Sequence, residues 1–374
     1  MKKAILIPDS FKGTLSSAQI CEIMGNQIRL RFPDCEVVSI PVADGGEGSV
    51  DAFLTALGGE KVFVEAANPY FEPMQAFYGL IDGGRTAVIE MAACAGLPLV
   101  ADRKDPTRTT TYGVGQLILD AVGRGVKRIV VGLGGSATTD AGCGAAAAIG
   151  VKFYNAAGAV FVPVGGTLKD VVKIDLGDSQ EKLRGVEIVT MCDIDNPMYG
   201  PHGAAYVFGP QKGADAEMVK FLDDGLRHVG EVIRKELGRD LTEVPGGGAA
   251  GAMGVGMVAF FGSTLQMGIE TVLDTVNFDA ILAGADAVFT GEGKLDTQSL
   301  RGKVVIGVAR RAKKQNVPVI AVVGGVDLDV DEAYDEGVKA IFTINRLPQD
   351  LSVSSAYSDL NLAFAMDNIL RMMK

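Results

Sequence analysis

The stretch KAILIPDSFKGTLSSAQICEIMGNQI, residues 3–28, decides the fold class. Its short apolar run, Ala4–Ile7, predicts a buried strand that ends at a polar turn. A helix is expected next, because Ser16 and Gln19 have the spacing of a capping box and the following apolar residues recur on one helical face. A further strand and helix are expected within residues 35–57. This β-α-β-α order is typical of a parallel sheet with helices on its faces.

The middle of the chain departs from that alternation. From Lys61, strand-like runs separated by turn residues predict an antiparallel meander. The last third again alternates between helices and strands. We therefore expect an α/β protein in which a discontinuous Rossmann-like parallel-sheet domain, residues 1–60 and 261–374, carries an inserted mixed α/β domain, residues 61–260. The strand at 127–133 is compatible with either sheet.

Composition excludes several classes of protein. With 374 residues, 48% of them hydrophobic and 22% charged, the chain is too apolar for a disordered protein. The net charge of −11 argues against nucleic acid and anionic membranes as partners. The five cysteines form no C-x-x-C pair, and the apolar run after Lys3 is too short for a signal peptide, so we expect a cytoplasmic protein. The uncharged segment 244–269 is interpreted as a buried glycine-rich loop and helix, because its glycines and acidic flanks do not suit a membrane span.

Glycine is in excess, with 49 residues, and many of these glycines lie in polar loops after predicted strands. Ligands of open α/β sheets bind at such strand ends. The first loop offers Asp9, Ser10 and Lys12 just before a helix, which suits a phosphate or carboxylate, although a capped helix start is the plainer interpretation. The second loop, after the second strand, places Asp44 among glycines, and it is either a simple turn or a metal or hydroxyl contact.

A third loop, residues 132–142, joins a strand to a helix with glycines, hydroxyls and one acid. Backbone N–H groups without a Cβ in the way are what a phosphate needs, although tight packing of helix on strand would use the same glycines. The residues predicted to contact a bound phosphate are Gly134, Gly135, Ser136, Thr138 and Asp140.

Three further segments carry charge. Asp193 and Asn196 follow a strand, and their oxygens suit Mg²⁺. Glu292 and Lys294 lie in a glycine-flanked loop that would hold magnesium and phosphate, or else form neutral pairs at the surface. Arg108 and Lys212 are candidate contacts for an anion, with helix capping as the alternative around Arg108.

Several known signatures are absent. No P-loop motif and no H-R-D or D-F-G motif of the protein kinases occurs. A formal G-x-G-x-x-G at Gly246, Gly248 and Gly251 follows no convincing strand, so it gives only slight support to a dinucleotide site.

Six long motifs in order resemble the glycerate kinase family that includes the bacterial glycerate 2-kinases of glucarate and glyoxylate catabolism. They are PDSFKGTLS (8–16), ADGGEGS (43–49), DPTRTTTYGVGQL (105–117), GLGGSATTDAGCG (132–144), CDIDNPMYGPHGAAYVFGPQKGA (192–214) and GEGKLDTQSLRGKV (291–304). The resemblance implies ATP-dependent phosphorylation of glycerate, magnesium, and a Rossmann-like domain interrupted by a second α/β domain. The chain departs from the family pattern at Thr139 and Ser49, and neither departure changes a charge.

From these residues we expect the triphosphate of ATP to lie against the 132–142 loop, with Lys12 and Lys294 as cationic contacts. Magnesium would be held by Asp193 with Asn196 or Glu292. Glycerate would be bound by Arg108 or Lys212, with Asp9 and Ser10 nearby, and its hydroxyl would face Asp193 or Asp44 as the base. A nucleotide-dependent oxidoreductase and a non-catalytic two-domain binding protein remain alternatives. The position of the phosphorylated hydroxyl, 2 in preference to 3, and a homodimer are left open by the sequence.

Overall fold

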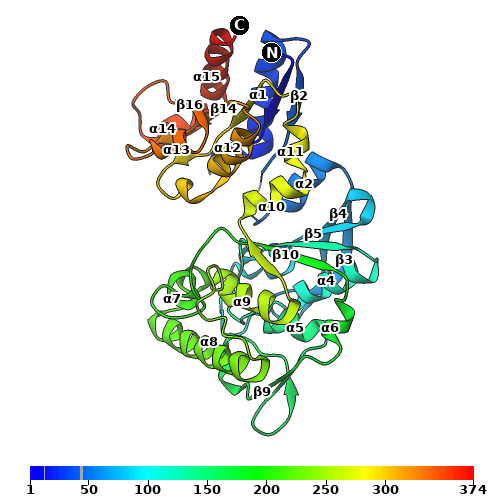
Figure 1. Cartoon of the computed structure of the whole chain (residues 1–374). Helices are drawn as coiled ribbons and strands as arrows, with labels where there is room; N and C mark the ends of the chain where they lie inside the picture. Colours follow the sequence, from blue (N-terminus) through cyan, green and yellow to red (C-terminus); the bar gives the residue numbers. More distant parts are fainter. Residues whose placement is uncertain (12, 43–44) are drawn as a thin grey trace. The chain divides into compact units, whose positions relative to one another are not determined.

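The structure is a computed structural model that describes residues 1–11, 13–42 and 45–374 (Figure 1). The chain divides into two compact units. The first comprises Met1–Ala43, Thr55–Leu57 and Met267–Lys374, and the second comprises Asp44–Leu54 and Gly58–Gln266. Each unit has its own sheet, so the chain leaves the first sheet and later returns to it.

The first unit contains a five-stranded sheet in the order β16-β14-β12-β1-β2, and all its strand pairs are parallel. Its strands are β1 (Lys3–Leu6), β2 (Glu36–Ser39), β12 (Ala287–Thr290), β14 (Val319–Val323) and β16 (Val338–Thr343), and the short strands β13 (Lys294–Leu295) and β15 (Gly325–Val326) form a separate pair. Its helices are α1 (Ser17–Arg31), α10 (Gly268–Thr275), α11 (Phe278–Ile281), α12 (Val304–Lys314), α13 (Glu332–Asp335), α14 (Leu351–Ser354) and α15 (Ser358–Met372).

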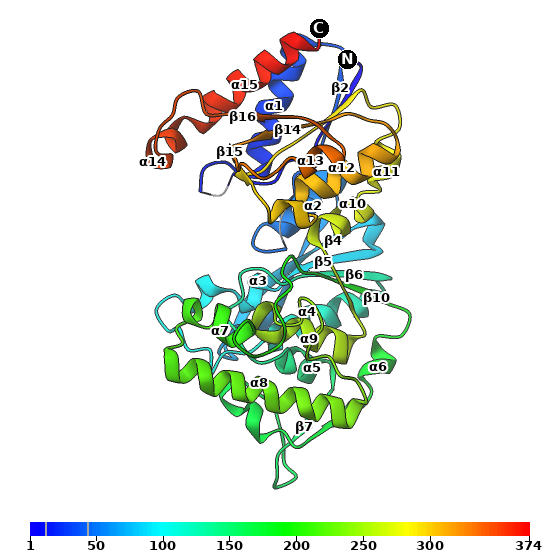
Figure 2. The same ribbon diagram turned by 60° about the vertical axis from the view of Figure 1, so that its left-hand side comes forward.

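Helix α1 forms for the reason that the sequence gives. Ser16 Oγ accepts a hydrogen bond from Gln19 N, and Gln19 Oε1 accepts one from Ser16 N, which completes the predicted capping box. The buried residues Ile20, Met24 and Ile28 lie on one face of the helix. They join a core made with Leu6 of the sheet and with α15, which lies beside α1 (Figures 1 and 2).

The second unit contains a six-stranded mixed sheet in the order β11-β10-β6-β5-β4-β3. Its strands are β3 (Glu60–Ala67), β4 (Pro73–Ile81), β5 (Thr86–Glu90), β6 (Arg128–Gly132), β10 (Glu187–Met191) and β11 (Thr264–Gln266). Strands β3, β4 and β5 form the expected antiparallel meander, whereas β5, β6, β10 and β11 are parallel. The strands β7 (Lys152–Tyr154), β8 (Val160–Phe161) and β9 (Lys173–Asp175) make a small separate sheet. The parallel strands in the main sheet of each unit confirm the expected α/β class.

Helices of the second unit are α2 (Ser49–Leu57, whose last three residues are assigned to the first unit), α3 (Ala92–Ala95), α4 (Tyr112–Gly123), α5 (Cys143–Ile149), α6 (Ser179–Lys182), α7 (Ala204–Phe208), α8 (Ala216–Leu237) and α9 (Ala249–Phe261). Short 3₁₀ helices occur at Asp82–Gly84, Leu97–Val100, Gly165–Asp170, Pro210–Lys212, Ser299–Arg301 and Ser355–Tyr357. No helix in the described part of the chain is long and apolar enough to cross a membrane. The uncharged segment 244–269 instead contributes α9, which is buried.

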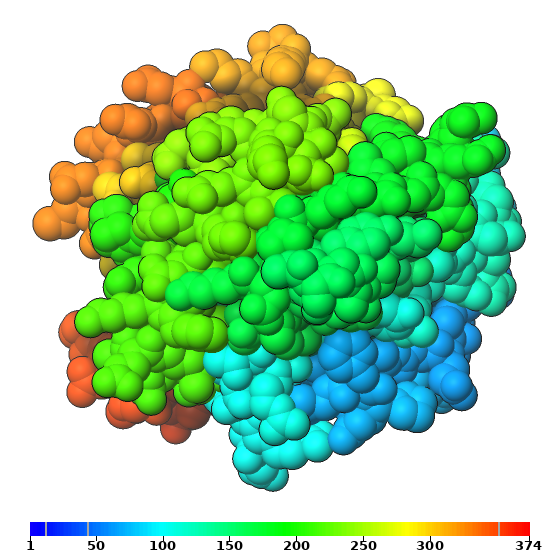
Figure 3. Space-filling model, turned by 90° about the horizontal axis from the view of Figure 1, so that it is seen from below, coloured from blue at the N-terminus to red at the C-terminus, as the bar shows by residue number. Residues whose placement is uncertain are grey.

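Helix α8 lies along the surface of the second unit, in the green and yellow-green part of Figure 3. Its N-cap, Asp215, accepts hydrogen bonds from two backbone N–H groups, and Gly238 ends it in the left-handed conformation. Phe221 belongs to the apolar stripe of the sequence but is 40% exposed, with the Lys169 ammonium 5.1 Å from its ring centre. The buried face of α8 is therefore narrower than the set of apolar residues on that side of the helix.

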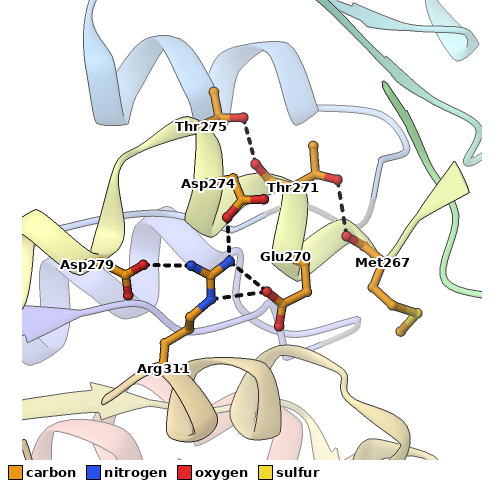
Figure 4. Close-up of polar contacts among 7 residues, drawn as sticks. All are labelled: Met267, Glu270, Thr271, Asp274, Thr275, Asp279 and Arg311. Atoms are coloured by element: carbon orange, nitrogen blue, oxygen red, sulfur yellow. Dashed lines mark hydrogen bonds and ion pairs between the residues drawn. The ribbon is translucent and has the colours of Figure 1, made fainter. Parts of the chain in front are cut away.

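Arg311 of α12 joins three acidic residues of the first unit (Figure 4). Its Nη2 lies 2.8 Å from Glu270 Oε2, its Nη1 lies 2.8 Å from Asp279 Oδ2, and Nη2 also bonds Asp274. The Arg311 side chain is 17% exposed, so water competes with these bonds less than it does at the open surface. This guanidinium fixes α10 and α11 against α12.

The variant Arg311→Leu is expected to unfold more easily, because three neighbouring carboxylates lose their common cation. The carboxylates are 32–52% exposed, so we expect a loss on the order of 2 kcal/mol in the free energy of unfolding and a smaller loss in high salt. Urea unfolding measures it. Arg371→Leu removes a more exposed ion pair with Asp367 as a control, and an equal loss in both variants would contradict the prediction.

Candidate active site

The predicted site residues divide between the two units. Asp9, Ser10, Glu292 and Lys294 belong to the first unit, and the others that the structure describes belong to the second. Lys12 and Asp44 lie outside the described residues, so their roles stay predictions.

In the first unit, Asp9 and Glu292 follow neighbouring parallel strands, β1 and β12. The two loops are bonded to each other, because Asp9 N donates to Gly291 O at 2.8 Å. Glycine is required at 291, since a Cβ there would lie 2.0 Å from Val322 O. Asp9 Oδ1 accepts a hydrogen bond from Ser10 N at 2.6 Å. These two polar loops therefore leave the same edge of one sheet.

Glu292 is a buried carboxylate with an unused acceptor. Its side chain is 6% exposed, and Oε1 has no hydrogen-bond partner among the described atoms. Burial raises its pKa to about 7, and the nearby Asp9 carboxylate adds to the shift while the Ser299 hydroxyl opposes it. Such a carboxylate is suited to bind a cation.

The described residues contain no group of three or more histidine, cysteine or acidic side chains arranged to hold a metal. Mg²⁺ does not need one, because it binds through one or two carboxylates and completes its shell with phosphate and water oxygens. Glu292 in the first unit fits this donor chemistry, as do Asp193 and Asn196 in the second. Lys294 is exposed and forms an ion pair of 3.0 Å with Asp327.

In the second unit, the loop from β6 to α5 is held by backbone bonds along its length. Gly134 N donates to Gly45 O at 3.0 Å, Ala137 N to Ala95 O at 2.9 Å, and Ala141 N to Gly251 O at 3.0 Å. A Cβ on Gly134 would lie 2.5 Å from Gly46 Cα, so backbone packs directly on backbone. Gly134 is half-buried and Gly135 exposed, whereas Ser136, Thr138 and Asp140 are buried.

Two buried charges lie beside this loop. The Asp140 carboxylate is 0% exposed and accepts hydrogen bonds from the backbone and side chain of Thr111 and from the backbone of Gly142 and Gly144. Lys212 is 2% exposed, and its Nζ donates to Thr138 O at 2.5 Å. Burial lowers the pKa of Lys212 to about 7, and Asp140 opposes that shift. Lys212 is therefore a buried lysine with a lowered pKa rather than a surface lysine.

The remaining predicted residues lie at more open positions. Asp193 follows β10 and is half-buried. Asn196, in the same loop, donates from Nδ2 to His202 O at 2.8 Å and accepts from Gly248 N at its backbone oxygen. The exposed Arg108 lies in a turn that Asp105 closes.

A family model described as the glycerate kinase family matches residues 4–374, nearly the whole chain. This chain belongs to the glycerate kinase family. It is 42% identical to a glycerate kinase of Bacillus cereus, over 100% of this chain and 98% of that one, and 42% identical to a glycerate 2-kinase of Escherichia coli K12, over 99% and 95%. A solved structure described as a glycerate kinase 2 from Salmonella typhimurium LT2 has a TM-score of 0.87 at 39% identity, covering 100% of this chain and 98% of that one.

These comparisons confirm the membership that the six motifs indicated, and with it the expectation that the chain is an enzyme of the glycerate kinase family. They leave the roles of single residues open, so the assignments of nucleotide, metal and glycerate contacts stay predictions.

The sequence analysis of this glycerate kinase family member missed Glu90 and Thr111. Glu90 is the last residue of β5 and is 4% exposed. Its carboxylate accepts a hydrogen bond from Val50 N at 3.0 Å, in the first turn of helix α2. The N-cap of that helix, Gly48, has no side chain that could accept this bond. An acid at the end of the apolar run TAVIE, residues 86–90, is the signal that could have found it. Thr111 is one of three adjacent threonines, and only the fold shows which of them bonds Asp140.

Gly251→Ala is expected to damage the 132–142 loop. Gly251 has φ +69°, and a Cβ there would lie 2.0 Å from Thr138 O, so the loop must move. Gly262→Ala is the matched control, because Gly262 has φ +63° with open space around it, and it should cost only the roughly 1 kcal/mol of the left-handed conformation. Urea unfolding and kinase activity are the measurements. Equal behaviour of the two variants would show that the close packing has no consequence.

Glu292→Gln is expected to stabilise the protein at pH 8. The folded-state pKa of about 7 exceeds the ordinary glutamate pKa of 4.5, so the wild type loses stability as the pH rises through this window, and glutamine does not. At pH 8 the gain should be on the order of 3 kcal/mol and should largely vanish near pH 4.5. Urea unfolding in EDTA measures it, with the exposed Asp329→Asn as control. A gain that does not depend on pH would refute the explanation.

Proposed function

We propose that this protein transfers the terminal phosphoryl group of ATP to the 2-hydroxyl of glycerate, with Mg²⁺ as the metal. The observation that carries the proposal is the full-length match to the glycerate kinase family, which includes a relative named as a glycerate 2-kinase that is 42% identical. The oxidoreductase and the non-catalytic binding protein are not favoured by that match.

For the nucleotide, we propose contacts from Gly134, Gly135, Ser136 and Thr138, with Lys294 and Lys12 as cations. The half-buried Gly134 and the exposed Gly135 support this assignment, because backbone without a Cβ can approach phosphate oxygens. The bonds that tie the loop to Gly45, Ala95 and Gly251 keep its donors in place before a ligand arrives.

For the metal, we propose Asp193, Asn196 and Glu292 as ligands. The unused oxygen of the buried Glu292 supports its inclusion, since a cation would offset the cost of its burial. Bound magnesium would neutralise charge on the transferring phosphoryl group.

For glycerate, we propose that Arg108 or Lys212 neutralises the carboxylate while Asp9 and Ser10 contact the hydroxyl groups. A buried ammonium such as that of Lys212 interacts strongly with an anion, because little water surrounds it. The base that accepts the hydroxyl proton is proposed to be Asp193 or Asp44.

We further propose that the enzyme acts in the cytoplasm, in organic-acid catabolism. The five cysteines are buried free thiols, which suits a reducing compartment. A homodimer remains part of the proposal to be tested by sedimentation.

An assay of ADP release with D-glycerate tests the reaction, and phosphorus NMR of the product identifies the phosphorylated hydroxyl. We expect ADP release that depends on glycerate and Mg²⁺, and 2-phosphoglycerate as the product. Formation of 3-phosphoglycerate would overturn the regiochemistry alone. Absence of ADP release, or reduction of NADP+ to NADPH in the presence of a hydroxy acid, would overturn the kinase proposal.

Asp193→Asn is expected to lower kcat by at least about a hundredfold, because the variant loses a metal ligand or the base. Its thermal unfolding should resemble that of the wild type. Asp195→Asn, two residues further along the same loop, is the matched control and should keep near-normal kcat. Near-normal turnover of Asp193→Asn would remove this residue from the mechanism.

A further inference from the structure

The Asp140 carboxylate is buried and is held almost entirely by hydrogen-bond donors of the protein itself. Oδ2 accepts from Thr111 N at 2.7 Å, from Thr111 Oγ1 at 2.9 Å and from Gly144 N at 3.3 Å, and Oδ1 accepts from Gly142 N at 3.1 Å. A carboxylate offers about four lone-pair positions, two on each oxygen, so the three donors occupy Oδ2 fully and Oδ1 keeps one position. The side chain is also 0% exposed. Asp140 therefore cannot reach a bound nucleotide without giving up its own partners.

The same four bonds join two separate segments. Thr111 is the N-cap of α4, whereas Gly142 and Gly144 lie at the start of α5. Thr111 Oγ1 also accepts a hydrogen bond from Ala145 N at 2.9 Å. Gly144 has no space for a side chain, since a Cβ would lie 2.2 Å from Thr110 Oγ1. Asp140 thus determines how the end of the 132–142 loop lies against the threonine segment.

Lys212 contacts the same loop at Thr138, two residues before Asp140. Its Nζ donates to Thr138 O, and the Thr138 and Thr139 hydroxyls are buried without a hydrogen-bond partner among the described atoms. A buried ammonium with one protein acceptor has N–H groups left for an anion. The two unpaired hydroxyls are further donors in the same place.

Few ionisable groups act on Lys212. Asp140 is the charged group that opposes the effect of burial on its pKa. Cys143 lies next to Asp140, and burial raises its pKa well above the usual value, so it is a neutral thiol. Lys104 Nζ bonds the backbone oxygen of Gln211, the residue before Lys212. The negative charge that sustains the Lys212 ammonium is accordingly that of Asp140.

We propose that Asp140 is a positioning residue for phosphoryl transfer, which holds the 132–142 loop in shape and keeps the buried Lys212 in its ammonium form without touching either substrate. This assignment rests on the proposed function for the role of Lys212 as an anion contact. It replaces the direct nucleotide contact expected of Asp140.

The proposal predicts how pH affects catalysis. Lys212 can neutralise the carboxylate of glycerate only while it is protonated. The KM for glycerate should therefore rise as the pH rises through the Lys212 pKa of about 7. Removing the negative charge in Asp140→Asn leaves burial unopposed, so the rise in KM should move to lower pH. At pH 6 the KM values of variant and wild type should approach each other.

The test combines kinetics with a direct titration. NMR of ¹³Cε-labelled lysine follows the Lys212 signal, which is assigned by its absence in Lys212→Arg. Asp140→Asn should lower both the pH midpoint of the Lys212 titration and the pH at which the KM for glycerate rises. Thr111→Val is the matched control, because it removes one hydrogen bond to Asp140 and leaves its charge, so it should lower stability with no shift in either midpoint.

Three results would overturn the proposal. They are an unchanged Lys212 midpoint in Asp140→Asn, an equal shift in Thr111→Val, and a wild-type KM profile in Lys212→Met. The last variant keeps the proposal testable if Asp140→Asn does not fold, because it removes the ammonium and keeps the carboxylate. Failure of the proposed function would appear differently, as absent ADP release in the wild type, while the NMR titration would still report on Asp140 and Lys212.

Discussion

The close approach of backbone to backbone at glycine is the constraint on which the second unit depends. A Cβ on Gly132 would lie 2.2 Å from Gly45 O, and one on Gly256 would lie 2.3 Å from Ala141 O. Loops that pack this tightly cannot carry side chains at the contact, so the excess of glycine is a packing requirement. The result is a loop after β6 whose position is fixed by its neighbours before any ligand binds.

The second constraint is the burial of four ionisable side chains, which lowers the free energy of unfolding. Glu90, Glu292, Asp140 and Lys212 are each less than 7% exposed. Burial shifts the pKa of each one toward its neutral form. Glu90 and Asp140 are compensated by backbone donors, whereas Glu292 and Lys212 keep hydrogen-bonding capacity that the described residues do not use fully. The two incompletely satisfied groups are those that gain from binding a cation and an anion, respectively.

Local patterns in the sequence predicted local structure well. The capping box of α1 and the antiparallel run β3–β5 both follow from residues close together in the chain. Asp9 and Glu292 were expected at the ends of strands, and β1 and β12 are indeed adjacent and parallel. Phe221 of α8 is 40% exposed although it is apolar, because helical periodicity does not show how wide the covering surface is.

By itself the sequence determined the α/β class, the family and the loops that carry polar residues, because these depend on short-range patterns and long motifs. Only the tertiary structure decided which of those residues are free to bind. Asp140 and Lys212 look alike in the sequence as polar residues of glycine-rich loops, yet the fold gives the Asp140 carboxylate four hydrogen-bond donors and the Lys212 ammonium one acceptor among the described residues. Burial and hydrogen-bond partners come from segments far apart in the chain, such as Thr111 and Gly251, and no local pattern encodes them.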